Sequence, residues 1–437
     1  MVRRDWKIAG EISHLQRLEP SSGLTMTVDI QPDRIMRELA ELATFSNASL
    51  PAVTRVVFSA QDLAARAWFK RLCVERALTV REDSVGNTFA RWAGADPDLP
   101  AVATGSHMDA IPNAGRFDGT VGVLGGLEAI RTLRSNGFQP WRSIELILFT
   151  SEEPTRFGVG CVGSRLLSGS LSAKVADQMK DEDGGTLAEI RERAGFRGDL
   201  ESVRLNPDFY SGFVELHIEQ GPILEREQIN IGVVSHIAAP AALRIEIEGE
   251  GGHAGAVLMP QRRDAFSAAA ELALAIESAA RRTGSIDTVA TTGTCNVFPA
   301  AINSIPSKVQ LGVDVRDVDL ERRDSILHTV DKAAKRISAD RHVDISINVI
   351  TADAPAVSDE RICTTIRCAC QELGLTYRNM VSRAYHDCLF MSRICPASMI
   401  FIPCRNGVSH RPDEYASEED IVNGVRVLAR TLAQLAQ

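Results

Sequence analysis

The stretch from residue 99 to residue 158 constrains the fold more than any other part of the chain. An apolar strand (99–110) precedes a helix (121–138), and a second apolar strand (142–158) follows that helix. A strand, a crossover helix and another strand predict a parallel sheet with a right-handed connection. Ligands of such sheets bind beyond the carboxyl ends of the strands. We therefore expect the functional site at the edge where these two strands end.

The pattern changes near residue 236, which indicates a second folding unit. The segment 242–355 predicts strand, helix, strand, strand, helix, strand, the order of a ferredoxin-like α+β unit. Helix, strand and helix then follow, and 437 residues are too many for one ordinary core. We therefore predict an α/β catalytic domain with a mixed, mostly parallel sheet and an inserted α+β domain. The expected parts are an N-terminal extension (1–30), the catalytic domain (1–235 and 347–437) and the inserted domain (236–346).

Charge and composition argue against several classes of function. The net charge of −9 disfavours a nucleic-acid or anionic membrane surface. The sequence contains no apolar run of about 18 residues, and its basic start lacks the apolar core of a signal peptide. The nine cysteines include no CxxC pair, which predicts reduced thiols. We expect a cytoplasmic protein without nucleic-acid or membrane partners.

Histidines and carboxylates recur directly after apolar strands or in loops of small residues. Each alone is weak evidence, since a single histidine at a strand end is more often a structural residue and a Glu-Glu pair is usually solvated. Together they provide mixed nitrogen and oxygen donors, which favour Zn, Mn, Ni or Co over Ca. These residues are His107, Asp109, Asp118, Glu152, Glu153, His217 and His410.

A hydrolase with two metal ions needs a bridging carboxylate, further ligands and a free base that takes a proton from water. The adjacent pair Glu152 and Glu153 can supply one ligand and one base. Neighbouring strand residues face opposite sides, so this arrangement requires a backbone bend. Pro154 marks the expected position of that bend.

Several motifs resemble the metal-dependent amidohydrolases of the M20 peptidase group. Within that group they resemble the branch of N-carbamoyl-amino-acid, allantoate and ureidoglycolate amidohydrolases, the last most of all. The resemblance covers nearly the whole chain and implies a zinc-peptidase-like catalytic domain with an inserted lid and dimerisation domain. The motifs are GSHMDAIPNAGRFDG, FTSEEPTRFG, ELHIEQGPILE and GVSHRPDEY, with GGHAGAVLMP, INSIPSK and SRAYHDCLFM favouring the ureidoglycolate branch.

Carried over residue by residue, the resemblance implies two divalent ions per subunit, with Mn²⁺ preferred over Zn²⁺, Ni²⁺ or Co²⁺. Asp118 would bridge the ions. Glu152 would be the general base and would later protonate the leaving amine. The remaining implied ligands are His107 and His217 for one ion, and Glu153 and His410 for the other.

The inserted domain would contribute substrate-binding residues. The resemblance implies that His253 stabilises the oxyanion, often across a dimer interface. Asn303 and Arg316 would bind the substrate carboxylate. An alternative for Arg316 is an ordinary ion pair with Asp314 or Asp317.

Four residues of the catalytic domain complete the expected site. Asp109 would orient the neighbouring imidazole, or merely cap its loop. Gln220 would bind the ureido group, or cap its own loop. Tyr385 would shape the pocket, and His386 would contact the substrate or form a buried pair with Asp387.

The resemblance implies hydrolysis of a ureido or carbamoyl C–N bond on a small anionic acid, in purine catabolism. We expect (S)-ureidoglycolate as substrate, giving glyoxylate, ammonia and CO2. The alternatives are allantoate, an N-carbamoyl-L-amino acid, or a catalytically inactive binding protein. A hinge near residues 236 and 347 would allow closure, and helix 261–284 with an exposed strand would form a homodimer. His236 has no role in this expectation.

Overall fold

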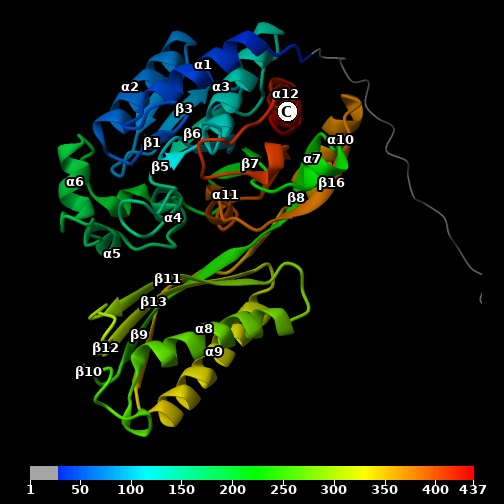
Figure 1. The fold of residues 1–437 in the computed structure, drawn as a ribbon. Helices are drawn as coiled ribbons and strands as arrows, with labels where there is room; N and C mark the ends of the chain where they lie inside the picture. Colours follow the sequence, from blue (N-terminus) through cyan, green and yellow to red (C-terminus); the bar gives the residue numbers. More distant parts are fainter. Residues whose placement is uncertain (1–27) are drawn as a thin grey trace, which may run out of the picture.

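The computed structural model describes residues 28–437, so the expected N-terminal extension lies almost entirely outside the described residues. A large nine-stranded sheet and a smaller four-stranded sheet each have their own hydrophobic core (Figure 1). None of the helices in residues 28–437 combines the length and the apolar character needed to span a membrane.

The large sheet is mixed, and its four central strands β17, β7, β4 and β6 are parallel. Antiparallel strands flank this centre on both sides. The strands are β2 (Thr79–Glu82), β3 (Thr88–Trp92), β4 (Ala101–His107), β6 (Ile144–Phe149), β7 (Tyr210–Ile218), β8 (Ile231–Ile237), β15 (Ala356–Val357), β16 (Tyr377–Ser382) and β17 (Ala397–Ile402).

Helices cover both faces of the large sheet, which explains why its central strands are almost continuously apolar. In β4, for example, Val102 packs into one core while Ala101 and Ala103 pack into the other. One face carries α1 (Pro32–Thr44), α2 (Ala60–Glu75), α3 (Thr120–Ser135), α10 (Glu360–Glu372) and α12 (Glu418–Leu435). The other face carries α4 (Val162–Ser168), α5 (Ala173–Asp177), α6 (Leu187–Arg193) and α11 (Asp387–Met391).

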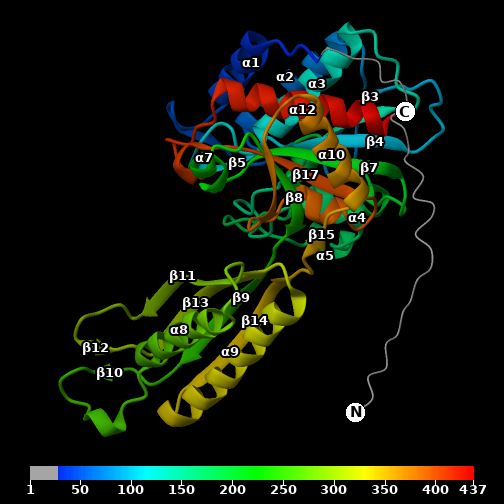
Figure 2. The same ribbon diagram turned by 90° about the vertical axis from the view of Figure 1, so that its right-hand side faces the viewer.

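The inserted unit confirms the ferredoxin-like prediction. Its antiparallel sheet has the order β11-β13-β9-β14, and two long helices pack on one face of it (Figure 2). The elements in chain order are β9 (Ala239–Glu248), α8 (Ala265–Arg282), β11 (Val289–Phe298), β13 (Lys308–Asp317), α9 (Leu320–Arg341) and β14 (Asp344–Ala352). The predicted division at residue 346 falls within β14, and the exact domain limits stay a prediction.

Short elements lie beside the two sheets. Strands β1 (Val53–Arg55) and β5 (Ala110–Ala114) form one antiparallel pair, and β10 (Gly252–His253) and β12 (Ser304–Ile305) form another. Helix α7 (Ile223–Glu227) follows β7. Strands β9 and β14 connect the inserted unit to the large sheet (Figure 1).

Candidate active site and metal centre

The polar residues meet where three neighbouring parallel strands end. His107 is the last residue of β4, and His217 is the last residue but one of β7. The Glu152–Glu153 pair follows β6, the other neighbour of β4. Asp118 lies in the loop between β5 and α3. The strand order therefore brings distant segments of the sequence to one sheet edge, as the alternation of strands and helices predicted.

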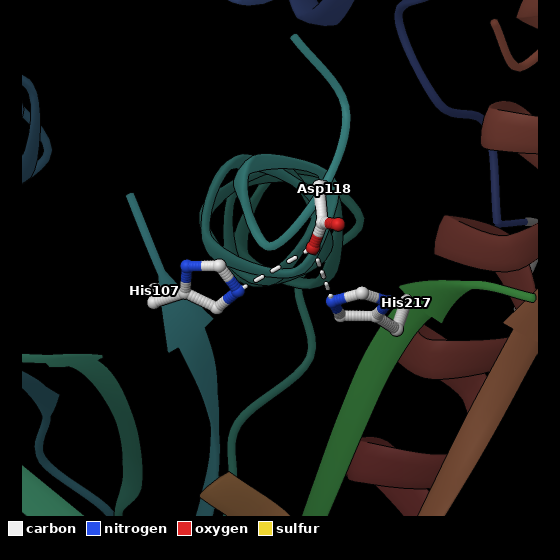
Figure 3. A group of neighbouring side chains, drawn as sticks. All are labelled: His107, Asp118 and His217. Carbon is white, nitrogen blue, oxygen red and sulfur yellow. Dashed lines mark ion pairs between the residues drawn. The ribbon is translucent and has the colours of Figure 1, made fainter. Parts of the chain in front are cut away.

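Asp118 lies at the centre of the site, and its two carboxylate oxygens face different partners. Oδ1 is 3.5 Å from Nε2 of His107 and 3.2 Å from Nε2 of His217 (Figure 3). Oδ2 is 3.3 Å from Nε2 of His410, which is itself 3.4 Å from Oε1 of Glu153. Two trios thus share Asp118, and the potential ligand atoms of each trio lie within 4.8 Å of one another.

The buried histidines hold one tautomer. Nδ1 of His107 lies 3.0 Å from the carbonyl oxygen of Asp109, and Nδ1 of His217 lies 2.9 Å from that of Ile218. A carbonyl oxygen only accepts hydrogen bonds, so we assign the ring proton to Nδ1 in both cases. In the neutral form that binds a metal, Nε2 of each ring then presents a lone pair to the centre, which is the usual arrangement of a metal-binding histidine.

The backbone bend that turns Glu152 and Glu153 toward the same site begins at Ser151. Ser151 has a φ of 56° and lies two residues beyond the end of β6. The expected bend is therefore present, but it starts before Pro154. The carboxylate of Asp109 accepts hydrogen bonds from the backbone N–H groups of Glu152 (3.3 Å) and Glu153 (3.0 Å). Asp109 thus fixes the Glu-Glu turn, while its carbonyl orients the imidazole.

The site holds more buried carboxyl groups than histidines. Burial raises the pKa of Glu152 well above its usual range, and the charge of Glu153 adds to this shift. Burial and the charge of Asp118 raise the pKa of Glu153 to about 7. Burial acts to lower the pKa of His107, yet the carboxylates of Glu152 and Asp118 raise it well above its usual value. Two divalent cations fit this mixed donor set and would supply the positive charge.

The model of peptidase family M20/M25/M40 matches residues 103–434. The chain belongs to this family. A protein from Oryza sativa subsp. japonica, described as ureidoglycolate hydrolase, is 52% identical over 420 residues, which are 95% of this chain and 87% of that protein. Crystal structures of AtUAH in complex with glyoxylate and with (S)-hydroxyglycine are 50% identical, with a TM-score of 0.88, and cover 94% of this chain and 98% of theirs. The resemblance inferred from the motifs is confirmed.

In this M20 protein a cavity of about 190 Å³ is lined by the whole Asp118–Glu153–His410 trio, and Asp118 is also the member it shares with the other trio. Its size suits a small substrate. Besides Asp118, Glu152, Glu153 and His410, its walls contain four of the residues predicted to bind substrate: Gln220, Arg316, Tyr385 and His386.

Arg316 reaches the cavity from the inserted domain of the M20 fold. It lies on β13 at the end nearest the catalytic domain, and its guanidinium is 5.5 Å from the centre of the Tyr385 ring. Nε is also 2.7 Å from Oδ1 of Asp314, so the ion-pair alternative is present as well. Asp317 pairs instead with Arg322. The partly exposed side chain of Asp314 therefore holds the guanidinium of Arg316 at the cavity wall.

Gln220 and His386 differ in how their polar atoms are used. Nε2 of Gln220 donates to Oδ2 of Asp118 at 2.6 Å, and its Oε1 is buried without a partner in residues 28–437. That oxygen can accept a hydrogen bond from an amide. His386 donates from Nε2 to Ser382, whose hydroxyl is itself committed to a carbonyl. Burial holds the pKa of His386 well below its usual value, so the ring is neutral.

The structure does not bring His253 and Asn303 to this cavity within one chain. Strand β9 leads away from the catalytic domain, and His253 follows its far end, paired with Ser304 (Figure 2). His253 and Asn303 are both exposed, and neither lines the cavity. Their roles toward substrate stay predictions. His236 pairs with Val357 in the large sheet and also lies outside the cavity wall.

Two fully buried carboxylates lie beneath the trios: Glu215, which the sequence reasoning missed, and Asp387, which it named only as a possible partner of His386. Glu215 accepts hydrogen bonds from the Ser106 hydroxyl (2.7 Å) and the Cys388 backbone N–H (2.9 Å), which ties β4, β7 and α11 together. Asp387 accepts from the Ser164 hydroxyl at 2.5 Å instead of pairing with the adjacent histidine. Glu215 lies two residues before the candidate ligand His217 on β7, so the period of two could have indicated it. No local signal marks the role of Asp387.

Proposed function

We propose that the chain is a binuclear metal-dependent amidohydrolase that cleaves a ureido C–N bond of (S)-ureidoglycolate. The products would be ammonia, CO2 and, in the end, glyoxylate, in a step of purine catabolism. One observation carries this proposal: Oδ1 of Asp118 faces His107 and His217 while its Oδ2 faces His410, and Glu152 lies beside His107. The ureidoglycolate hydrolases among the relatives support the choice of substrate.

His107, Asp118 and His217 would hold one cation, and Asp118, Glu153 and His410 the other. We propose Mn²⁺, with Zn²⁺, Ni²⁺ or Co²⁺ as alternatives for this donor set. Cations of this kind would supply Lewis acidity, which lowers the pKa of water and polarises a carbonyl group.

Glu152 is the proposed general base. Its Oε2 lies 3.6 Å from Nε2 of His107, and its raised pKa suits a group that must hold a proton between two steps. The carboxylate would take the proton of the attacking water and then give it to the nitrogen that leaves as ammonia. Arg316 would bind the substrate carboxylate, and Oε1 of Gln220 would accept from the ureido N–H.

Exposed residues of the inserted domain motivate a proposed homodimer. Since His253 and Asn303 lie away from their own cavity, a second copy is the proposed source of these two side chains. Closure of the inserted domain about β9 and β14 would then assemble the full site and exclude water.

A substrate panel tests the reaction. Ammonia release by the Mn²⁺-loaded protein is measured with (S)-ureidoglycolate, allantoate and several N-carbamoyl-L-amino acids. We expect the highest kcat/KM with (S)-ureidoglycolate, loss of activity with EDTA, and recovery with Mn²⁺. A higher kcat/KM for allantoate or a carbamoyl amino acid would reject the assigned substrate.

A base variant tests the mechanism on the same substrate. Glu152→Gln keeps the shape of the side chain but cannot accept the proton, so we expect kcat to fall by at least ~100-fold. The variant should still bind Mn²⁺, since the ligands are unchanged. Wild-type turnover by Glu152→Gln would remove this residue from the role of base.

A further inference from the structure

His410 is the least sheltered residue of the two trios, and it lies on a loop instead of a strand. Its side chain is 48% exposed, compared with 8% or less for Asp118 and Glu153. Its backbone has a φ of 58°, a left-handed conformation that a residue with a side chain seldom adopts unless its surroundings impose it. Something other than sheet hydrogen bonding must therefore hold this loop against the site.

Glu414, four residues further along the same loop, makes that connection. Its carboxylate is 4% exposed, and Oε1 accepts hydrogen bonds from the backbone N–H groups of Phe117 (2.8 Å) and Asp118 (3.0 Å). A Cβ atom on Gly115 would lie 2.4 Å from this same oxygen, so the glycine leaves the room that Glu414 occupies. Glu414 thus ties the loop of His410 to the backbone of Asp118, the proposed bridging residue.

Ser409 links the side chains of Asp118 and Glu414 through its hydroxyl group. Its Oγ lies 2.7 Å from Oδ2 of Asp118 and 2.9 Å from Oε2 of Glu414. The hydroxyl has one proton, so it donates to one of these carboxylates at a time. Ser409 directly precedes His410, and a shift of the serine would move the imidazole with it.

We propose that Glu414 and Ser409 are positioning residues that hold His410 and Asp118 in the geometry needed to bind the second cation. This inference rests on the proposed function, because it concerns the cation of the Asp118–Glu153–His410 trio. Neither side chain is placed against the substrate, so each would act only through the ligand that it positions. His107 and His217, the two histidines of the other trio, lie on strands and need no such loop.

Mn²⁺ titration by calorimetry, with bound metal counted after gel filtration, tests the inference on the full chain. We expect Glu414→Ala to lower the affinity for one of the two ions by roughly 10- to 100-fold, which is the usual effect of removing a residue that orients a ligand. The titration should resemble that of His410→Ala, which removes the ligand itself. Glu414→Gln keeps an oxygen for both backbone N–H groups, so it should bind both ions within about threefold of wild type.

Glu128→Ala is the matched control for general destabilisation. Glu128 is also fully buried and accepts from a backbone N–H, at Gln31, but it lies on α3 and pairs with Arg34 of α1, away from the site. This variant should bind two ions as wild type does. If Glu414→Ala also binds two ions with wild-type affinity, or if Glu128→Ala loses one, the inference is wrong.

Hydrogen–deuterium exchange of the metal-free protein gives a second readout that does not depend on the reaction. We expect backbone amides of residues 405–414 to exchange at least about tenfold faster in Glu414→Ala than in wild type, and faster to a smaller extent in Ser409→Ala. Ser409→Ala, a small change in a half-buried residue, replaces Glu414→Ala in both assays should the latter not fold. A wild type that binds fewer than two ions rejects the binuclear proposal, and unchanged exchange in this loop rejects the positioning role.

Discussion

At the scale of single residues, Asp109 shows how one side chain can arrange several others. Its carboxylate accepts hydrogen bonds from two backbone N–H groups of the Glu-Glu turn. Its carbonyl oxygen accepts a hydrogen bond from Nδ1 of His107. We expect Asp109→Asn to lower kcat roughly 10- to 100-fold. The asparagine side chain would place its own NH2 group against one of the two backbone N–H groups of the Glu-Glu turn. Asp264→Asn makes the same change where a carboxylate also accepts two backbone N–H groups, at the start of α8. That control should keep full activity, and equal losses in the two variants would contradict the assignment.

The charges of the site predict how metal affinity depends on pH. Without metal, hydrogen bonding to Asp118 raises the pKa of His410 to about 9, and burial raises the pKa of Glu153 to about 7. Protons therefore compete with cations for these ligands, and Mn²⁺ affinity should rise as pH increases from 6 to 9. Calorimetry at pH 7 in buffers of different ionisation enthalpy should show that binding releases protons. Proton uptake, or an affinity independent of pH, would contradict the charge state described here.

At the scale of elements, the start of α3 packs closely against the candidate ligand His107. Gly119 has a φ of 66°, and a Cβ atom added to it would lie 2.4 Å from Nε2 of His107. We expect Gly119→Ala to lose about 1 kcal/mol of unfolding free energy through its backbone and, in addition, to displace the imidazole. Mn²⁺ binding and activity should then fall while the circular dichroism spectrum stays that of wild type.

Gly137, beyond the other end of the same helix, offers a matched comparison. Its φ is 75°, and an added Cβ atom would meet nothing within 4 Å. Gly137→Ala should therefore lose a similar amount of stability, measured by urea unfolding, and keep its metal. Equal metal affinity in the two alanine variants would show that the contact with His107 does not matter.

At the scale of the whole molecule, an ion pair joins the inserted domain to the loop that carries Tyr385. Arg383 lies 2.6 Å from Asp287, which precedes β11, and the Arg383 carbonyl accepts from Arg316. The pair is partly exposed, so its contribution is up to about 1 kcal/mol. We expect Arg383→Ala to raise KM by up to about fivefold with little change in kcat, because Arg316 is held less firmly at the cavity.

The charge-reversed double variant Asp287→Arg with Arg383→Asp provides the control for that prediction. It restores an attraction across the same contact, so KM should return toward the wild-type value in steady-state assays. Arg281→Ala removes an exposed ion pair within α8 and should change neither constant. The link between the two domains is rejected if the double variant is no better than the single one.

Much of the architecture follows from local patterns in the sequence. Apolar strands such as 99–110 and the helix that follows them predict a parallel sheet, and the run 242–355 predicts the ferredoxin-like unit, because periodicity and chain order are local properties. The candidate ligands His107, Glu153 and His217 could be proposed because they lie at or just beyond strand ends, where the topology of such sheets brings side chains together.

Only the tertiary structure decided the contacts between segments far apart in the sequence. Asp109 accepts from the backbone N–H of Glu152, Glu215 accepts from that of Cys388, and Glu414 accepts from that of Asp118. These pairs are separated by 43 to 296 positions. No propensity or spacing encodes such contacts, because they exist only once packing has placed two backbones side by side. The sequence determined which side chains could bind a cation, and the packed fold determined which other residues hold them in place.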